Sequence, residues 1–178
     1  IYALKKDEVV AENAPYEPCT RQGATAAEIE LLLKTASEKK HCKVRTIRVG
    51  YVFGPAIYDY LMESTFKDMP KNGRLTWLCR SDSFVHQFTY TIDVAALACL
   101  LAKTVVEPYD FTVHFSGYTY YSVDAFGAAI AQVAGKPFQK RIHSKFQLFL
   151  AQFINANVGR GQDLWPYFEA PSLLEDSA

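Results

Sequence analysis

Blocks of apolar residues with two different periods alternate along the chain and predict helices and strands in alternation. The first clear block, residues 24–39, has the period of an amphipathic helix. Its apolar positions are Ile29, Leu32, Leu33 and Ala36. Residues 44–54 (VRTIRVGYVFG) are rich in β-branched and aromatic side chains, so they predict a buried strand that ends in a turn at Gly54-Pro55.

The second half of the chain continues this pattern. Asp93 precedes the apolar run VAALACLLAKTVV, which predicts an N-cap and a helix buried on most of its sides. Residues 111–116 (FTVHFS) predict a strand, and Ser122 and Gly135 bracket a further helix as its two caps. Weaker patterns predict a helix at 57–68, short strands at 75–79 and 138–143, and a helix with an aromatic face at 145–158.

A loop is predicted for residues 5–23, because they are rich in charge and contain Pro15 and Pro18. Strands that alternate with helices are typical of an α/β fold with some parallel pairing. The 178 residues are enough for one compact domain, so we predict a single domain over 1–178. The first residue is Ile rather than Met, as expected of a piece of a longer protein.

Composition and charge narrow the function classes. Lys and Arg together number 19, as do Asp and Glu, so no net charge favours nucleic acid or an anionic membrane. No apolar stretch approaches the length of a membrane span. The histidines show no i,i+4 pair and the cysteines no CxxC spacing, so we predict no metal site and reduced thiols in a cytoplasmic protein. These residues are His41, His86, His114, His143, Cys19, Cys42, Cys79 and Cys99.

Three segments carry a resemblance to a known family. They are RQGATAAEIE (21–30), RVGYVFGP (48–55) and FTYTIDVAALA (88–98). In this order they resemble the second half of extended short-chain dehydrogenases/reductases, which include NAD-dependent nucleotide-sugar epimerases and dehydratases. The resemblance implies the C-terminal part of a Rossmann-like NAD(P)-binding α/β fold. It also implies that residues 1–110 hold the end of the sheet and the pocket, and 111–178 mainly a small substrate-binding lobe.

The resemblance also implies a cofactor, NAD or NADP, and a small-molecule substrate such as a nucleotide sugar. The residues that it places near the nicotinamide end of the cofactor are Val49, Gly50, Tyr51 and Val52. Those that it places at the border of the substrate pocket are Phe53, His86, Gln87 and Phe88. Without any ligand, Gly54-Pro55 also reads as an ordinary turn and Asp93 as an ordinary cap.

Two parts of the family's machinery are missing from this sequence. No Gly-rich GxxGxxG turn occurs, so the chain alone is expected to bind NAD(P) weakly or not at all. The family's catalytic Tyr and Lys positions align with Gln22 and Ala26, which cannot supply a proton or a charge. A literal Tyr-x-x-x-Lys at Tyr2 and Lys6 lies far from this helix.

Several functions stay open from the sequence. The first is an epimerase/dehydratase-like oxidoreductase or isomerase, to which this chain contributes a substrate-binding part that is inactive alone. In that case the proton would come from another group, such as His86. The alternatives are a non-catalytic NAD(P)-binding sensor or scaffold and a protein-interaction module, and a homodimer is a candidate assembly. All assume that the strand ending at Gly54-Pro55 and the helix capped by Asp93 flank one cleft.

Overall fold

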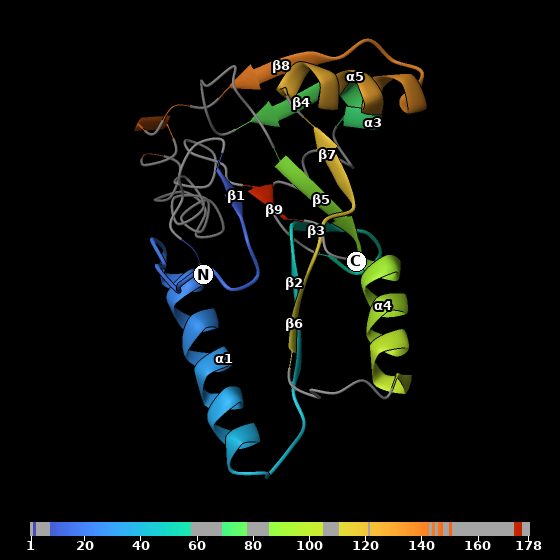
Figure 1. The fold of residues 1–178 in the computed structure, drawn as a ribbon. Coiled ribbons are helices and arrows are strands. Elements are labelled where there is room, and N and C mark those ends of the chain that lie inside the picture. Colours follow the sequence, from blue (N-terminus) through green and yellow to red (C-terminus); the bar gives the residue numbers. More distant parts are fainter. Residues whose placement is uncertain are drawn as a thin grey trace. The chain divides into compact units, whose positions relative to one another are not determined.

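The structure is a computed structural model, shown in Figure 1. The residues that it describes are 2, 8–57, 69–77, 86–104, 111–120, 122–142, 144, 146–147, 150 and 173–175. The helix predicted at 57–68 and most of that predicted at 145–158 lie outside them. The chain divides into two compact units, residues 1–55, 87–119 and 172–178, and residues 56–86 and 120–171.

The first unit is built from parallel strand pairs and two helices, which confirms the α/β class. Its helices are α1 (Arg21–Glu38) and α4 (Thr91–Lys103), and its strands are β1 (Val9–Val10), β2 (Arg45–Val49), β3 (Tyr51–Phe53), β6 (Phe111–Phe115) and β9 (Leu173–Leu174), with most of β5 (His86–Tyr90) and β7 (Tyr118–Tyr120). Strand β2 pairs in parallel with β6, β3 with β5, and β1 with β9. Strand β7 adds to the other side of β5.

The single strand predicted at 44–54 is wrong, because the chain changes partners at Gly50. Before it, Arg48 is paired with His114 of β6, and after it Tyr51 is paired with Phe88 of β5. A Cβ on Gly50 would lie 2.4 Å from the backbone oxygen of Gln87, so no larger residue fits without a shift. The exchange of partners therefore depends on a tertiary contact that periodicity does not reveal.

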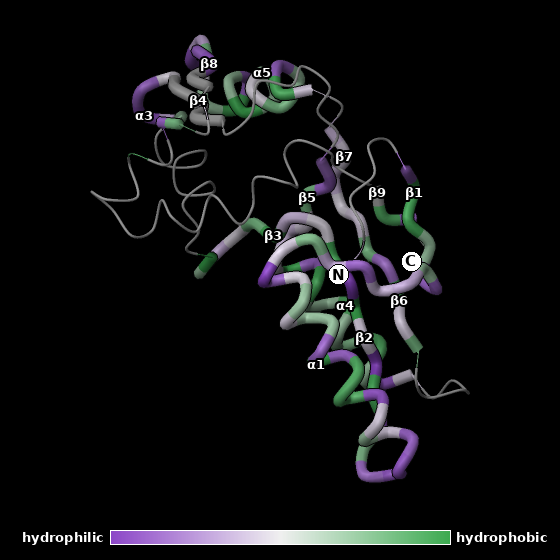
Figure 2. Tube along the Cα trace, turned by 90° about the vertical axis from the view of Figure 1, so that its left-hand side faces the viewer, coloured by the Kyte–Doolittle hydropathy of each residue, from purple (hydrophilic) through white to green (hydrophobic). Residues whose placement is uncertain are grey.

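Helix α1 begins three residues earlier than predicted. The hydroxyl of Thr20 accepts a hydrogen bond from the Gly23 backbone N–H at 3.0 Å and so forms the N-cap. The buried positions of α1 are small residues, Gly23, Ala27 and Ser37, whereas its large apolar side chains are exposed. Figure 2 shows these apolar stretches along α1.

Two predictions for α4 are wrong. The helix begins at Thr91 after Tyr90, whose side chain makes no capping bond, so Asp93 lies inside the first turn. An acidic side chain there still interacts favourably with the helix dipole. None of the residues of α4, all of which are described, is buried, and Ile92 and Leu100 are more than half exposed. The apolar run therefore does not mark a helix enclosed by this chain.

The named elements in the described part of the second unit are a strand pair and two helices. They are α3 (Met69–Asn72), β4 (Arg74–Trp77), α5 (Val123–Ala134) and β8 (Gln139–Ile142), and β4 pairs in parallel with β8. The predicted caps of α5 are confirmed: Ser122 accepts from the Ala125 N–H at 3.0 Å, and Gly135 is left-handed with φ of 63°. Among the described residues of the chain, no helix is long and apolar enough to cross a membrane.

Candidate functional site

The two motifs that were expected to lie together do so. Strand β3 ends at Phe53, and a Cβ on the next residue, Gly54, would lie 2.3 Å from the Thr91 hydroxyl oxygen at the start of α4. Gly54 has a φ of 136°, a conformation that side chains rarely adopt. Because β3 and β5 are parallel, both strands deliver their carboxyl ends to this edge, where α/β folds bind ligands.

The residues predicted to face the cofactor are consecutive in the chain and precede the carboxyl end of β3. Val49 is the last residue of β2, Gly50 is the link, and Tyr51 and Val52 open β3. All four are half-buried. They therefore lie on either side of the point where the chain changes strand partners, and their contact with a cofactor stays a prediction.

The residues predicted to border the substrate lie on β3 and the adjacent β5. Phe53 is half-buried, with its ring centroid 5.4 Å from that of Tyr90. Phe88 is only 2% exposed, so it packs in the interior rather than at a surface. Burial lowers the pKa of His86 to about 3, so its imidazole is neutral near pH 7. An imidazole in this state is a poor proton donor, which weakens the role considered for His86.

Gln87 has both ends of its side-chain amide engaged by the C-terminal strand. Its Nε2 donates to the backbone oxygen of Leu174 at 3.0 Å, and its Oε1 accepts from the Leu174 N–H at 2.8 Å. The sequence analysis placed Gln87 at the substrate pocket and did not predict its contact with Leu174, which lies 87 positions further along the chain.

The positions of the missing catalytic pair lie in the first turns of α1. Gln22 is exposed and Ala26 is half-buried. Neither side chain titrates, so this part of α1 offers no acid or base. Arg21 is exposed beside them, and Lys6 of the literal Tyr-x-x-x-Lys lies outside the described residues.

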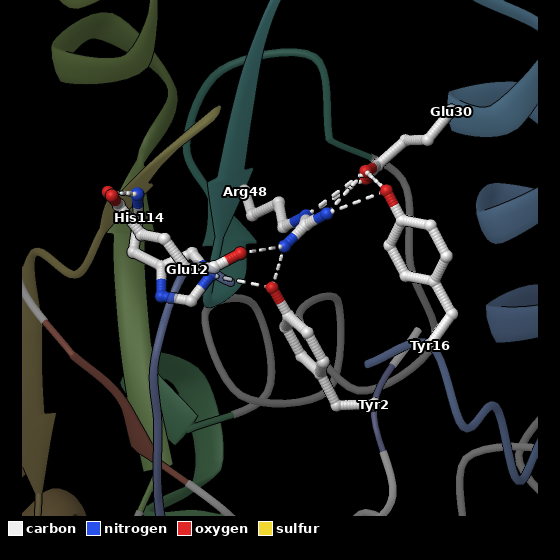
Figure 3. Close-up of polar contacts among 6 residues, drawn as sticks. All are labelled: Tyr2, Glu12, Tyr16, Glu30, Arg48 and His114. Atoms are coloured by element: carbon white, nitrogen blue, oxygen red, sulfur yellow. Dashed lines mark hydrogen bonds and ion pairs between the residues drawn. The ribbon is translucent and has the colours of Figure 1, made fainter. Parts of the chain in front are cut away.

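A buried polar cluster, here called the Arg48 cluster, lies between α1 and strand β2 (Figure 3). Its members are Tyr2, Glu12, Tyr16, Glu30, Arg48 and His114. The guanidinium of Arg48 forms an ion pair with Glu30 at 2.6 Å and donates to Tyr16 Oη at 3.0 Å. It also donates to the backbone oxygen of Glu12 at 3.0 Å and to the hydroxyl of Tyr2.

The cluster extends to β6 through His114, which is fully buried. The Tyr2 hydroxyl and His114 Nε2 share a hydrogen bond of 2.8 Å, and the His114 backbone N–H donates to Glu12 Oε1 at 2.8 Å. Burial, followed by the charge of Arg48, lowers the pKa of His114. Tyr2 is thus the partner of the Nε2 atom of His114.

Burial also changes the acidity of the groups around Arg48. Burial, together with the hydrogen bond to Glu30, raises the pKa of Tyr16 to about 12, so its phenol stays protonated near neutral pH. Burial raises the pKa of Glu30, and the hydrogen bond from Tyr16 opposes that shift. The cluster therefore joins α1 to β2 and β6 through fixed charges and phenols, a positioning role.

In the described part of the chain, no group of three or more His, Cys, Asp or Glu side chains could hold a metal ion. Cys19, Cys42 and Cys99 are exposed free thiols. Cys79 lies outside the described residues.

Solved structures similar to this chain include enzymes that hold NAD. A UDP-glucuronic acid 4-epimerase from Bacillus cereus, in complex with UDP-glucuronic acid and NAD, matches with a TM-score of 0.66 and 20% identity over 79% of this chain and 45% of the epimerase. A monomeric L-threonine 3-dehydrogenase from a metagenome matches with a TM-score of 0.65 and 18% identity over 83% of this chain and 49% of the dehydrogenase. A dTDP-glucose 4,6-dehydratase from Streptomyces venezuelae, with NAD bound, matches with a TM-score of 0.65 and 15% identity over 79% of this chain and 44% of the dehydratase.

These matches fix the fold and the extent of the likeness. The chain has the fold of part of these Rossmann-fold, NAD-binding enzymes, as the three motifs predicted. It spans less than half the length of each. No protein-family model matches the sequence, and no curated protein matches it.

Proposed function

We propose that this chain is the C-terminal, substrate-binding part of an NAD(P)-dependent epimerase- or dehydratase-like oxidoreductase or isomerase, and that it is inactive alone. One observation carries the proposal: β3 and β5 end together at the paired residues Phe53 and Tyr90, directly before Gly54 and Thr91, at the edge where such folds bind ligands. The likeness to enzymes that hold NAD and nucleotide sugars supports it.

Within this proposal, the half-buried strand path from Val49 to Val52 faces the nicotinamide end of NAD or NADP. Phe53 and His86 border a small-molecule substrate, for which a nucleotide sugar is the proposed class. The fit to a whole dinucleotide is incomplete, because the sequence has no Gly-rich turn for the pyrophosphate. We therefore assign this chain contacts with one end of the cofactor and no proton-transfer step.

Cofactor binding tests the proposal. The isolated chain and the full-length product of its gene are each titrated with NADH and NADPH by calorimetry. We expect micromolar binding by the full-length protein and no saturable binding by the chain. Micromolar binding by the chain alone, or none by the full-length protein, would contradict the proposal.

A second candidate is a non-catalytic NAD(P)-binding sensor or scaffold, which the residues at the catalytic positions favour. Gln22 and Ala26 supply neither the acid/base nor the charge of the usual pair. The two candidates separate in the wild-type full-length protein: turnover of a nucleotide sugar supports the enzyme, whereas NAD(P) binding without turnover supports the sensor. New turnover after Gln22→Tyr and Ala26→Lys are combined supports the alignment of these two positions with the catalytic pair.

The proposal also includes a cytoplasmic protein that acts as a homodimer. The exposed apolar side chains of α1 support the dimer. They are Ile29, Leu31, Leu32 and Leu33, with exposed fractions of 51, 49, 71 and 41%. Ile29, Leu32 and Leu33 share one side of the helix, and an exposed apolar surface of this kind is typical of one that another chain covers.

A further inference from the structure

The C-terminal strand β9 is held along both of its edges. On one edge, Leu173 and Leu174 pair in parallel with Val9 and Val10, and the Glu175 N–H donates to the Val10 oxygen at 3.0 Å. Successive residues of a strand point their N–H and C=O groups to opposite edges. Leu174 therefore turns its own pair away from β1, and the Gln87 amide binds both groups at 2.8 and 3.0 Å.

Gln87 thus takes the place of a neighbouring strand at the outer edge of β9. A side-chain amide carries one donor and one acceptor side by side, as a peptide group does. It therefore recognises an extended backbone rather than a particular side chain. Gly50 is required behind it, because a Cβ there would lie 2.9 Å from Gln87 Cβ.

The contact is specific but short. Strands β1 and β9 have two residues each, and a pair of that length has little stability of its own. The addition of an extended segment to a strand edge is a common mode of peptide binding, in which main-chain bonds give the affinity. A segment held by so few bonds is able to leave and rebind.

We propose that β1 and Gln87 form a strand-accepting site, here called the β9 slot, whose occupant is the chain's own C-terminal segment Leu173–Glu175, docked as an exchangeable latch. While the latch is closed, the Gln87 amide is engaged and does not contact a ligand at the edge of β5. That consequence, unlike the slot itself, rests on the proposed function.

Hydrogen exchange on the full chain tests the role of Gln87. In Gln87→Leu both bonds to Leu174 are lost, so we expect the Leu174 amide to exchange at least about tenfold faster. Gln87→Glu, which is nearly isosteric, keeps an acceptor for the Leu174 N–H but sets a carboxylate oxygen against its carbonyl, so exchange also accelerates. The matched control is Gln132→Leu on the exposed side of α5, in the other unit.

Circular dichroism verifies that each variant is folded. Unchanged exchange at Leu174 in both folded Gln87 variants would overturn the assignment of Gln87 to the slot. Neither substrate nor cofactor enters this measurement, so its failure is distinct from a failure of the proposed function.

A labelled peptide tests whether the latch exchanges. A fluorescent peptide with the sequence of residues 171–177 (PSLLEDS) is titrated with the full chain, and its anisotropy is followed. We expect saturable binding that is lost with Gln87→Leu and with a peptide carrying Leu174→Pro, which lacks the N–H that Gln87 accepts. No saturable binding by the wild-type chain would overturn the exchangeable latch.

Discussion

Arg48 is the residue whose replacement is expected to destabilise the first unit most. Its side chain is 7% exposed, and that of its partner Glu30 is 12% exposed. Arg48→Met leaves the Glu30 carboxylate buried without its cation, so we expect the free energy of unfolding to fall by about 3 kcal/mol. Urea unfolding followed by circular dichroism measures this loss. Lys34→Met, on the exposed surface of α1, is the control, with a change within about 0.5 kcal/mol.

Equal unfolding midpoints for these two variants would contradict a stabilising Arg48 cluster. A cluster that only fills space would behave in that way, because methionine retains most of the apolar stem of arginine.

We expect the free energy of unfolding to decrease in acid because of two histidines, His86 and His114. Burial lowers the pKa of His86 from 6.5 to about 3 and lowers that of His114 from 6.5. The unfolded chain therefore binds protons first as the pH falls below 6.5. Above pH 6.5 each neutral histidine makes its full contribution to the free energy of unfolding. As the pH falls from there toward the pKa of the folded state, that contribution decreases by at most about 1.4 kcal/mol per pH unit.

Urea unfolding at a series of pH values between neutral and mildly acidic measures this slope. His86→Asn is expected to lose less stability on acidification than the wild type, because asparagine does not titrate. The same slope in His86→Asn and in the wild type would show that His86 does not contribute.

In helix α5, helix propensity and tertiary packing make opposite demands on position 127, which is glycine. Alanine is a better helix former than glycine, by about 1 kcal/mol in a helix interior. A Cβ on Gly127, however, would lie 2.4 Å from Phe138 Cε2. We therefore expect Gly127→Ala to lower the thermal midpoint, and Phe138→Leu to reduce that loss in the double variant. A stabilised Gly127→Ala variant would contradict the packing seen around Phe138.

Elements could be predicted where their signals are local. The caps of α5, Ser122 and Gly135, act within three or four residues of the helix end, and both are as predicted. The N-cap of α4 was misplaced because Asp93 resembles a cap in sequence, whereas β5 continues to Tyr90 and the helix starts directly after it. Which strand a segment pairs with, as at Gly50, is decided by distant residues.

The whole molecule determines what the sequence could not show. The Arg48 cluster joins Tyr2 to His114, 112 positions apart, and the β9 slot joins Gln87 to Leu174. No period or motif marks such contacts, although Arg48 and Glu30 both lie in the segments that carry the family resemblance. The residues predicted to border the substrate lie on the adjacent parallel strands β3 and β5, whereas their role in one pocket stays a prediction.

The exposed apolar side of α1 leads to a prediction about assembly. Leu32 is 71% exposed and Ile29 is 51% exposed, one turn apart on the same helix. If a second copy covers them, the wild-type chain is a dimer in light scattering and Leu32→Lys is a monomer, since burial of the new ammonium in that interface is unfavourable. Val133→Lys on α5 is the matched control, because Val133 is 92% exposed and lies in the other unit. A monomeric wild type would remove the homodimer from the proposal and leave the α1 surface to a different chain, whereas dimers in all three proteins would place the interface elsewhere.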